Sequence, residues 1–187
     1  MTDPLARVRE AASARGLEIE LRERPAAKSL PEAAALLGVK PADIVKTLVV
    51  KRPSTGSGNA TRSGNATGSG SATGSEAATG SGNTPEFLYA LVPGDRSISW
   101  PKLRAVVGVN KLALPDPDVA LAATGYERGT IVPIGAQGDW PVFADESIVG
   151  RRIAMGAGAH GYSLFVDADA LIAAFDATIA DISSEAG

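Results

Sequence analysis

Hydrophobic positions at the start of the chain recur at helical spacing. Leu5, Val8 and Ala12 lie three or four residues apart, so they share one face of a helix. Pro4 precedes them at a position that suits the first turn of a helix, and Gly16 follows them at a position that suits its end. The pattern predicts a first helix from about residue 4 to residue 15.

The spacing then changes to that of a strand, and later returns to that of a helix. Residues 17–22 alternate between apolar and charged side chains, which is typical of a half-buried strand. Ser29 and Glu32 have the spacing of a capping box, so we expect a second helix that Gly38 ends. A short turn at 41–43 leads into residues 44–51, which are rich in β-branched side chains and predict a second strand.

Shorter apolar runs follow after residue 86, separated by glycine and proline. We expect strands among the runs 87–92, 111–114, 130–134, 140–144, 152–155 and 163–166. We also expect three helices: one that Ser99 caps, one that runs from Asp116 or Asp118 to Gly125, and one that covers 169–177. Many of these runs are too close together for crossover helices. The pattern predicts an α+β fold with a mixed, strongly curved, barrel-like sheet and surrounding helices.

A repeat of six residues interrupts this pattern between Ser54 and Pro85. Its units read GSGNAT, RSGNAT, GSGSAT, GSEAAT and GSGNTP, and alanine is their only apolar residue. A β-helix would need a large aliphatic residue on each turn, so we interpret residues 54–85 as a flexible insertion. All nine aromatic residues lie between Phe87 and Phe175, and residues 1–53 are too few to hold a core alone. We therefore expect residues 1–187 to form a single domain that residues 54–85 interrupt.

Composition narrows the chemistry. The chain has no cysteine and one histidine, which excludes disulfides, thiolate metal sites and the two-histidine zinc helix. The composition therefore argues against metal-dependent hydrolysis. A formal charge of −3 argues against coating DNA or RNA by bulk electrostatics, although a local basic pocket could still hold an RNA end. With no signal-peptide pattern and no apolar run long enough to span a bilayer, we expect a cytoplasmic protein without membrane partners.

Residues 156–161 match the G-x-G-x-x-G pattern of dinucleotide-binding loops. That pattern needs a helix after it, because the pyrophosphate sits on the helix N-terminus. Here a predicted strand follows, which argues against a nucleotide site. A turn around Gly156 and Gly158 whose backbone approaches a ligand closely is the better interpretation.

Lys46 is the most informative single charge, because its neighbours in the strand 44–51 are aliphatic. Alternation places its side chain on the same face as Ile44, Leu48 and Val50. A lysine there either reaches water from an edge strand or holds an anionic or carbonyl oxygen in a pocket. The two readings are about equally supported by the pattern.

Three further features are candidates for a site. Asp145 ends an expected strand and could pair with a lysine, or could be a solvated strand end. Residues 129–135 have glycine at both ends and an internal proline, which suits a plain turn or a rigid pocket wall. His160 lies in the glycine turn without a serine motif nearby, which favours a hydrogen-bonding role over that of a base. No G-x-S-x-G or Walker A motif occurs.

Six segments together resemble the YbaK family, the prolyl-tRNA synthetase-associated editing domains. They occur in the family's order, and the likeness extends over nearly the whole chain except 54–85; the segments are residues 44–50, 91–95, 124–129, 132–135, 145–147 and 156–158. The freestanding members are deacylases that act in trans on prolyl-tRNA-type tRNAs charged with a small amino acid such as alanine or cysteine. The cysteine-clearing members have an aromatic residue in the strand before the second helix, and residues 21–24 here have none. The resemblance therefore does not specify which amino acid is removed.

The resemblance implies a YbaK-like fold, a mischarged aminoacyl-tRNA as substrate and prolyl-tRNA synthetase as a further partner. It also implies that the site needs no metal and no organic cofactor. It implies that Lys46 is the catalytic residue and that the substrate-binding residues are Thr47, Gly129, Val132, Pro133, Gly135, Asp145, Gly156, Gly158 and His160. An activated ester needs only orientation, donors for the developing negative charge and water, so backbone amides and a lysine suffice. The main alternative is a non-catalytic module that binds a tRNA acceptor end or a synthetase, and the second alternative is a nucleotide-binding protein.

Overall fold

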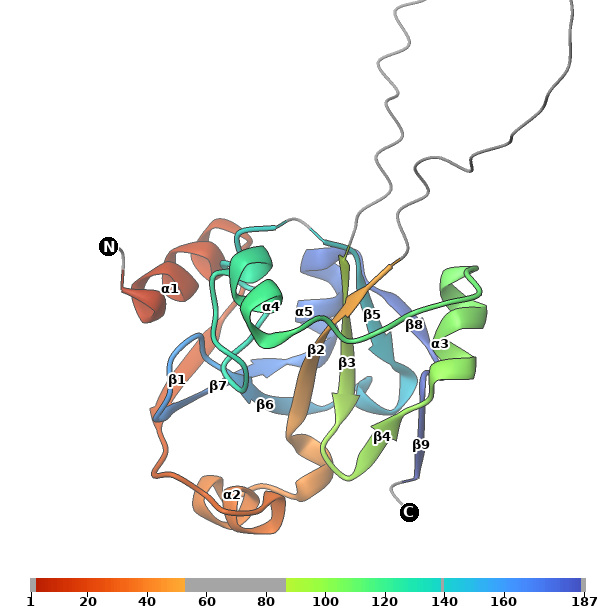
Figure 1. Ribbon diagram of the computed structural model, residues 1–187. Helices are drawn as coiled ribbons and strands as arrows, with labels where there is room; N and C mark the ends of the chain where they lie inside the picture. Colours follow the sequence, from red (N-terminus) through yellow and green to blue (C-terminus); the bar gives the residue numbers. More distant parts are fainter. Residues whose placement is uncertain (1–2, 53–86, 139, 186–187) are drawn as a thin grey trace, which may run out of the picture.

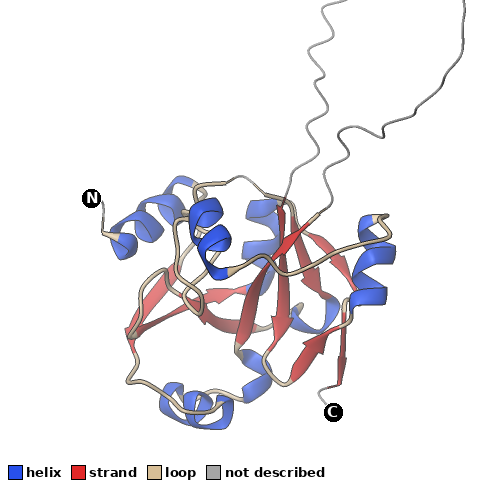
Figure 2. Ribbon diagram, in the orientation of Figure 1, coloured by secondary structure: helices blue, strands red, loops and turns tan. Residues whose placement is uncertain are grey.

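A computed structural model describes residues 3–52, 87–138 and 140–185, and Figure 1 shows their arrangement. The predicted insertion at 54–85 lies outside the described residues. In the described part, three sheets are surrounded by helices, which confirms an α+β fold (Figure 2). No helix in that part has both the length and the apolar character that crossing a membrane requires.

The largest sheet has four strands in the order β2-β3-β5-β8 and passes through the middle of the molecule (Figure 1). β2 (Val45–Lys51) pairs antiparallel with β3 (Phe87–Pro93), as the two apolar runs predict. β3 also pairs in parallel with β5 (Val142–Asp145), and β5 pairs in parallel with β8 (Thr178–Ala180). The sheet is therefore mixed, and β2 is one of its edges.

A second sheet and a two-stranded ribbon complete the β-structure. The second sheet has the order β1-β7-β6, formed antiparallel by β1 (Ile19–Glu23), β7 (Tyr162–Asp167) and β6 (Arg152–Gly156). The ribbon pairs β4 (Arg96–Ile98) with β9 (Ser183–Glu185). One parallel bridge, between Ile44 and Ala154, joins the first two sheets. The predicted strongly curved, barrel-like sheet is therefore wrong: the described strands form three separate sheets, because the bridge between the first two does not extend into a ladder.

The central sheet is buried on both faces. Val45, Val49 and Tyr89 belong to the larger core, which continues into the second sheet. Val50 and Leu88 belong to a second core beneath α3 (Trp100–Val107), on the side that also carries β4 and β9 in Figure 1. All seven residues of β3 are buried, as expected for a central strand covered on both sides.

The predicted helices are present, and the capping signals act as expected at Asp3 and Ser29, whereas Ser99 and Asp116 form no side-chain cap hydrogen bond. Besides α3, the described helices are α1 (Pro4–Ala14), α2 (Leu30–Leu37), α4 (Pro117–Thr124) and α5 (Ala168–Phe175), and the 3₁₀ turns are η1 (Pro41–Asp43) and η2 (Glu146–Ile148). Asp3 accepts a hydrogen bond from the amide of Leu5 at the start of α1. Gly38 ends α2 in the left-handed conformation, with φ of 69°.

Two strand predictions are wrong and three strands are missed. Residues 111–114 form a single bridge, between Ala113 and Lys51, instead of a strand. Residues 130–134 form a turn-containing loop, because the glycines at both ends take positive φ and Pro133 cannot donate to a ladder. β4, β8 and β9 have three residues each, too few for a periodic signal.

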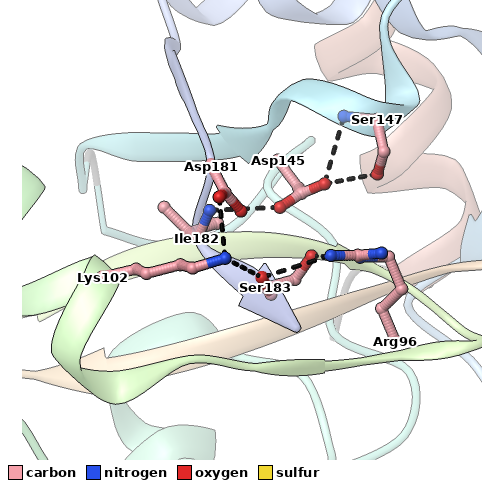
Figure 3. A network of polar contacts seen from close by, with 7 residues as sticks. All are labelled: Arg96, Lys102, Asp145, Ser147, Asp181, Ile182 and Ser183. Atoms are coloured by element: carbon pink, nitrogen blue, oxygen red, sulfur yellow. Dashed lines mark hydrogen bonds and ion pairs between the residues drawn. The ribbon is translucent and has the colours of Figure 1, made fainter. Parts of the chain in front are cut away.

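A polar network holds the C-terminal strand against the body of the fold (Figure 3). Arg96 Nε donates to Ser183 Oγ at 2.7 Å, and Lys102 Nζ contacts Asp181 Oδ2 at 2.7 Å and the Ser183 carbonyl at 2.9 Å. Asp145 Oδ2 accepts from the Ile182 amide at 3.1 Å. These contacts join β4, α3 and β5 to residues 181–183.

Candidate functional site

A cavity of about 400 Å³ opens along the free edge of β2. Segments that are distant in the sequence line it: β2 itself, α2, the ends of β6 and β7, the loop before α4, and the residues after α4. Because β2 is an edge strand, one side of its backbone faces this cavity instead of another strand. The cavity is therefore the place where a ligand can reach the strand that carries Lys46.

Lys46 lies on the exposed part of this edge and lines the cavity. The sequence left open whether it is an edge lysine or a pocket lysine, and the structure gives it both features. Thr47 lines the same cavity, and its Oγ1 is buried with no hydrogen-bond partner in the part of the chain that is described. Lys46 and Thr47 are consecutive in β2, so their side chains leave the strand on opposite faces, and both residues line the cavity at its edge.

The charges around the cavity all have one sign. Arg24, Lys46 and Arg128 line it, and no aspartate or glutamate does. None of the three cations forms an ion pair within the described residues. Arg24 Nε donates to the hydroxyl of Ser163, at 3.1 Å. Such a cavity favours an anionic or oxygen-rich ligand, because its positive charges are not neutralised from within.

Gly129, Ile131 and Gly156 form one wall of the cavity. The amide of Gly158 donates to the Thr130 carbonyl at 2.8 Å, which ties the glycine turn to this wall. A Cβ on Gly156 would lie 2.8 Å from the Ile131 carbonyl oxygen and from the carbonyl group of Thr130. Only glycine allows β6 to approach the wall this closely.

We therefore expect Gly156→Ala to push the wall back and to weaken both the fold and the site. Overpacking of this kind costs about 1–3 kcal/mol, so the melting temperature falls and KM of the activity proposed below rises. Gly150→Ala is the matched control, because Gly150 has φ of 75° and open space around its Cβ position. The control loses stability through backbone strain alone. A KM that rises equally in both variants would contradict a role for Gly156 in shaping the site.

The segment 129–135 leaves this cavity after Ile131. Val132 is fully buried in the core, and Pro133 and Gly135 line a different cavity, of about 390 Å³, beside Trp140. Tyr126 holds the segment in place: its hydroxyl donates to the Ile134 carbonyl at 2.8 Å. Burial raises the pKa of Tyr126, against the smaller opposing effect of nearby Arg7, which keeps the hydroxyl a donor.

The remaining predicted residues lie outside the cavity. Gly158 packs against Tyr126, and His160 is exposed, with Nε2 2.9 Å from Glu127 Oε2. Asp145 is buried, and it accepts hydrogen bonds from the amide and hydroxyl of Ser147 (Figure 3). The structure thus brings Lys46, Thr47, Gly129 and Gly156 together at the cavity, and it does not bring Val132, Pro133, Gly135, Asp145, Gly158 or His160 there.

Burial on its own would raise the pKa of Asp145. Hydrogen bonds from the hydroxyl groups of Ser147 and Ser183, and from the amides of Ser147 and Ile182, outweigh that effect and hold the pKa below its usual value. The prediction that Asp145 pairs with a lysine is not supported, because its partners are neutral donors. Its role in the described structure is to fasten β5 to residues 181–183.

Sequence reasoning missed the two arginines of the cavity. Arg24 follows β1, and Arg128 lies in the loop after α4, and only the folded chain brings them to β2. Arg128 does lie within the segment 124–129 that carries the family resemblance, and that was the available signal. Within the described part of the chain, no group of three or more His, Cys, Asp or Glu side chains could hold a metal ion. The glycine turn is followed by β7, as predicted, and not by a helix.

Comparisons with known proteins agree on a family. The model of the aminoacyl-tRNA editing domain matches residues 24–174. A curated relative, a proline–tRNA ligase of Moorella thermoacetica, is 40% identical over 63 residues, which are 34% of this chain and 11% of the ligase. The chain therefore spans about a tenth of the length of that relative.

Two solved structures have the same fold. One is described as a candidate trans-editing enzyme for prolyl tRNA synthetase; it is 22% identical, with a TM-score of 0.74, and the match covers 100% of this chain and 99% of that one. The other is a hypothetical protein, APE2540, which is 24% identical, with a TM-score of 0.71 over 95% of this chain and 99% of that one. At these identities the likeness concerns the fold.

Proposed function

Because the chain belongs to the aminoacyl-tRNA editing domain family, the YbaK family, we propose that it is a trans-acting deacylase that hydrolyses mischarged aminoacyl-tRNA. The substrate we propose is a tRNA of the prolyl type that carries a small amino acid, such as alanine or cysteine. The partial match to a proline–tRNA ligase supports the prolyl type of the tRNA, and we propose prolyl-tRNA synthetase as a partner on the same ground.

The observation that carries this proposal is the cavity along β2. It holds three cations without an ion-pair partner among the described residues, and its lining contains no carboxylate. The end of an aminoacyl-tRNA offers phosphates, a ribose and an ester carbonyl, all of which are oxygen ligands for cations. A cavity of about 400 Å³ suits an aminoacyl group with part of the terminal nucleotide, and ligand sites commonly have this size.

The lining residues favour water as the nucleophile. No cysteine or histidine lines the cavity, and the hydroxyls of Thr47 and Ser163 have no histidine or carboxylate in the lining to activate them. In the proposed reaction, water adds to the carbonyl carbon of the ester and the carbon–oxygen bond to the ribose breaks. The products are the free amino acid, the free ribose hydroxyl and one proton. The ammonium of Lys46 stabilises the negative charge that develops on the carbonyl oxygen.

The apolar part of the lining suits a small side chain. Ile131, Met155 and Ala120 are buried and fixed in the larger core, so they cannot move away from a bulky group at little cost. A pocket of this kind discriminates by excluding side chains that are too large, which is how a second editing site spares correctly charged tRNA. We propose Ile131 and Met155 as the residues that set this limit.

The proposal is tested with tRNAs of the prolyl type that carry alanine, cysteine, serine or proline. We expect release of at least one of the small, incorrect amino acids at more than ten times the spontaneous rate, with prolyl-tRNA spared. A second tRNA charged with the same amino acid tests whether prolyl identity matters. Tight binding of the charged tRNA without faster release would favour the non-catalytic module, and equal release of proline would contradict the editing role.

A further inference from the structure

The direction of the backbone groups of β2 follows from its pairing with β3. The amide of Gly94 donates to the carbonyl of Ile44 at 2.6 Å, so residues 44 and 94 are a hydrogen-bonded antiparallel pair. In the register of this ladder, the even residues 46, 48 and 50 are then hydrogen-bonded to β3 as well. The odd residues 45, 47, 49 and 51 point their N–H and C=O groups away from β3.

Two further contacts agree with this assignment. Lys51 exchanges backbone hydrogen bonds with Ala113 on the side opposite β3, at 2.8 and 3.2 Å. Val45 lies opposite Pro93, which has no N–H to donate. The outward-pointing amides and carbonyls therefore alternate along the edge that lines the cavity.

The ends of this edge are covered and its middle is not. Ala113 pairs with Lys51 at one end, and Ala154 bridges Ile44 at the other. Between them, the outward N–H and C=O of Thr47 have no partner among the described residues. Unpaired backbone groups on a strand edge are a ready template for a further strand-like ligand.

An aminoacyl ester has the same arrangement of groups as one residue of a strand. Its α-ammonium is a donor and its ester carbonyl is an acceptor, and both are attached to one α-carbon. A residue that faces Thr47 in an antiparallel pair would donate to the Thr47 carbonyl and accept from the Thr47 N–H. The absence of a carboxylate from the lining also leaves a carbonyl oxygen as the natural partner for the α-ammonium.

We propose that Thr47 binds the aminoacyl group through its main chain, in the manner of one added strand residue. The α-ammonium donates to the Thr47 carbonyl, and the ester carbonyl accepts from the Thr47 N–H. The inference rests on the proposed deacylase function and specifies how its substrate is recognised. It makes the Thr47 N–H a donor to the oxygen on which negative charge develops, next to Lys46. It also makes the α-ammonium a requirement, whatever the side chain is.

The first test compares substrates. A tRNA or minihelix is acylated with alanine or with isobutyrate, in which a methyl group replaces the α-ammonium at nearly the same size. Each enzymatic rate is divided by the spontaneous rate of the same ester, because the ammonium itself activates the ester. We expect the acceleration to be at least about tenfold smaller for isobutyryl. Equal accelerations would overturn the inference while leaving the deacylase function intact, whereas no acceleration of either ester would overturn both.

The second test compares two variants of Thr47 with alanyl-tRNA. Thr47→Val removes the hydroxyl and keeps the N–H, while Thr47→Pro removes both without breaking a bond to β3, since this N–H points outward. We expect kcat of Thr47→Pro to be at least about tenfold below that of Thr47→Val, with both proteins folded by circular dichroism. Equal kcat values in two folded variants would contradict a role for the N–H. If Thr47→Pro does not fold, the comparison of the two esters decides.

Discussion

Replacing Lys46 with alanine is expected to lower kcat/KM for deacylation by at least about 100-fold, which corresponds to about 2.7 kcal/mol of transition-state stabilisation. The size of the effect follows from the cavity. Lys46 is one of three cations there, and it neighbours the strand edge where we place the ester carbonyl. Its side chain is exposed, so the variant should keep its melting temperature within a few degrees.

Lys51→Ala is the matched control for Lys46→Ala. Lys51 lies on the same strand and is also exposed, but it does not line the cavity. We expect its kcat/KM to stay within about threefold of the wild type, as for a surface charge distant from the reaction. A folded Lys46→Ala protein that releases the amino acid at the wild-type rate would remove Lys46 from the catalytic site.

Replacing Asp145 with asparagine is expected to have the largest effect on stability, about 2–3 kcal/mol in the free energy of unfolding. Asp145 is 1% exposed, and its carboxylate accepts hydrogen bonds from Ser147 and from the amide of Ile182. An asparagine presents an NH₂ group to donors on one side, so at least one buried donor loses its partner. Urea unfolding at pH 7 measures the loss. Deacylation at a temperature where the variant is folded should not change, since Asp145 does not line the cavity.

The same carboxylate predicts how stability changes in acid. The pKa of Asp145 is lower in the folded protein than in the unfolded chain. Its contribution is therefore fully present above the unfolded value of about 3.9, and it is lost as the pH falls through the folded pKa. The difference in the free energy of unfolding between the wild type and Asp145→Asn should therefore narrow below about pH 4. Asp181→Asn is the control, because Asp181 contacts Lys102 at 2.7 Å and both side chains are more than 40% exposed. Its loss in the free energy of unfolding should stay below about 1 kcal/mol. An undiminished gap at pH 3 would contradict the pKa argument.

Local signals in the sequence were enough to place most of the elements. Ser29, Gly38 and the β-branched run 44–51 act within a few residues, so their meaning does not depend on the rest of the fold. The loop 130–134 has the apolar pattern of a strand in the sequence because its apolar residues are buried without belonging to a sheet. The separation into three sheets depends on how β6 meets β2, a contact between residues more than 100 positions apart that no local pattern records.

The candidate site was predictable where one strand carries it. Lys46 and Thr47 are neighbours in the sequence and in the cavity, and Gly129 and Gly156 were found through the motifs that hold them. The division of residues 129–135 between two cavities depends on the turn that Tyr126 fastens, which the sequence does not reveal. The arginines of the cavity come from separate parts of the chain: Arg128 lies in a segment of the family resemblance, whereas no local pattern around Arg24 indicates that it reaches the cavity.

The central claim is that the cavity along β2 holds the aminoacyl end of a mischarged tRNA. A crystal structure with 3′-alanylamino-3′-deoxyadenosine, in which a stable amide replaces the ester, tests it most directly. We predict that the alanyl group lies against Thr47, with its carbonyl oxygen near Lys46 and the adenosine toward Arg24 or Arg128. An analogue bound instead in the cavity beside Trp140, or one that leaves the β2 cavity empty at saturating concentration, would contradict the account.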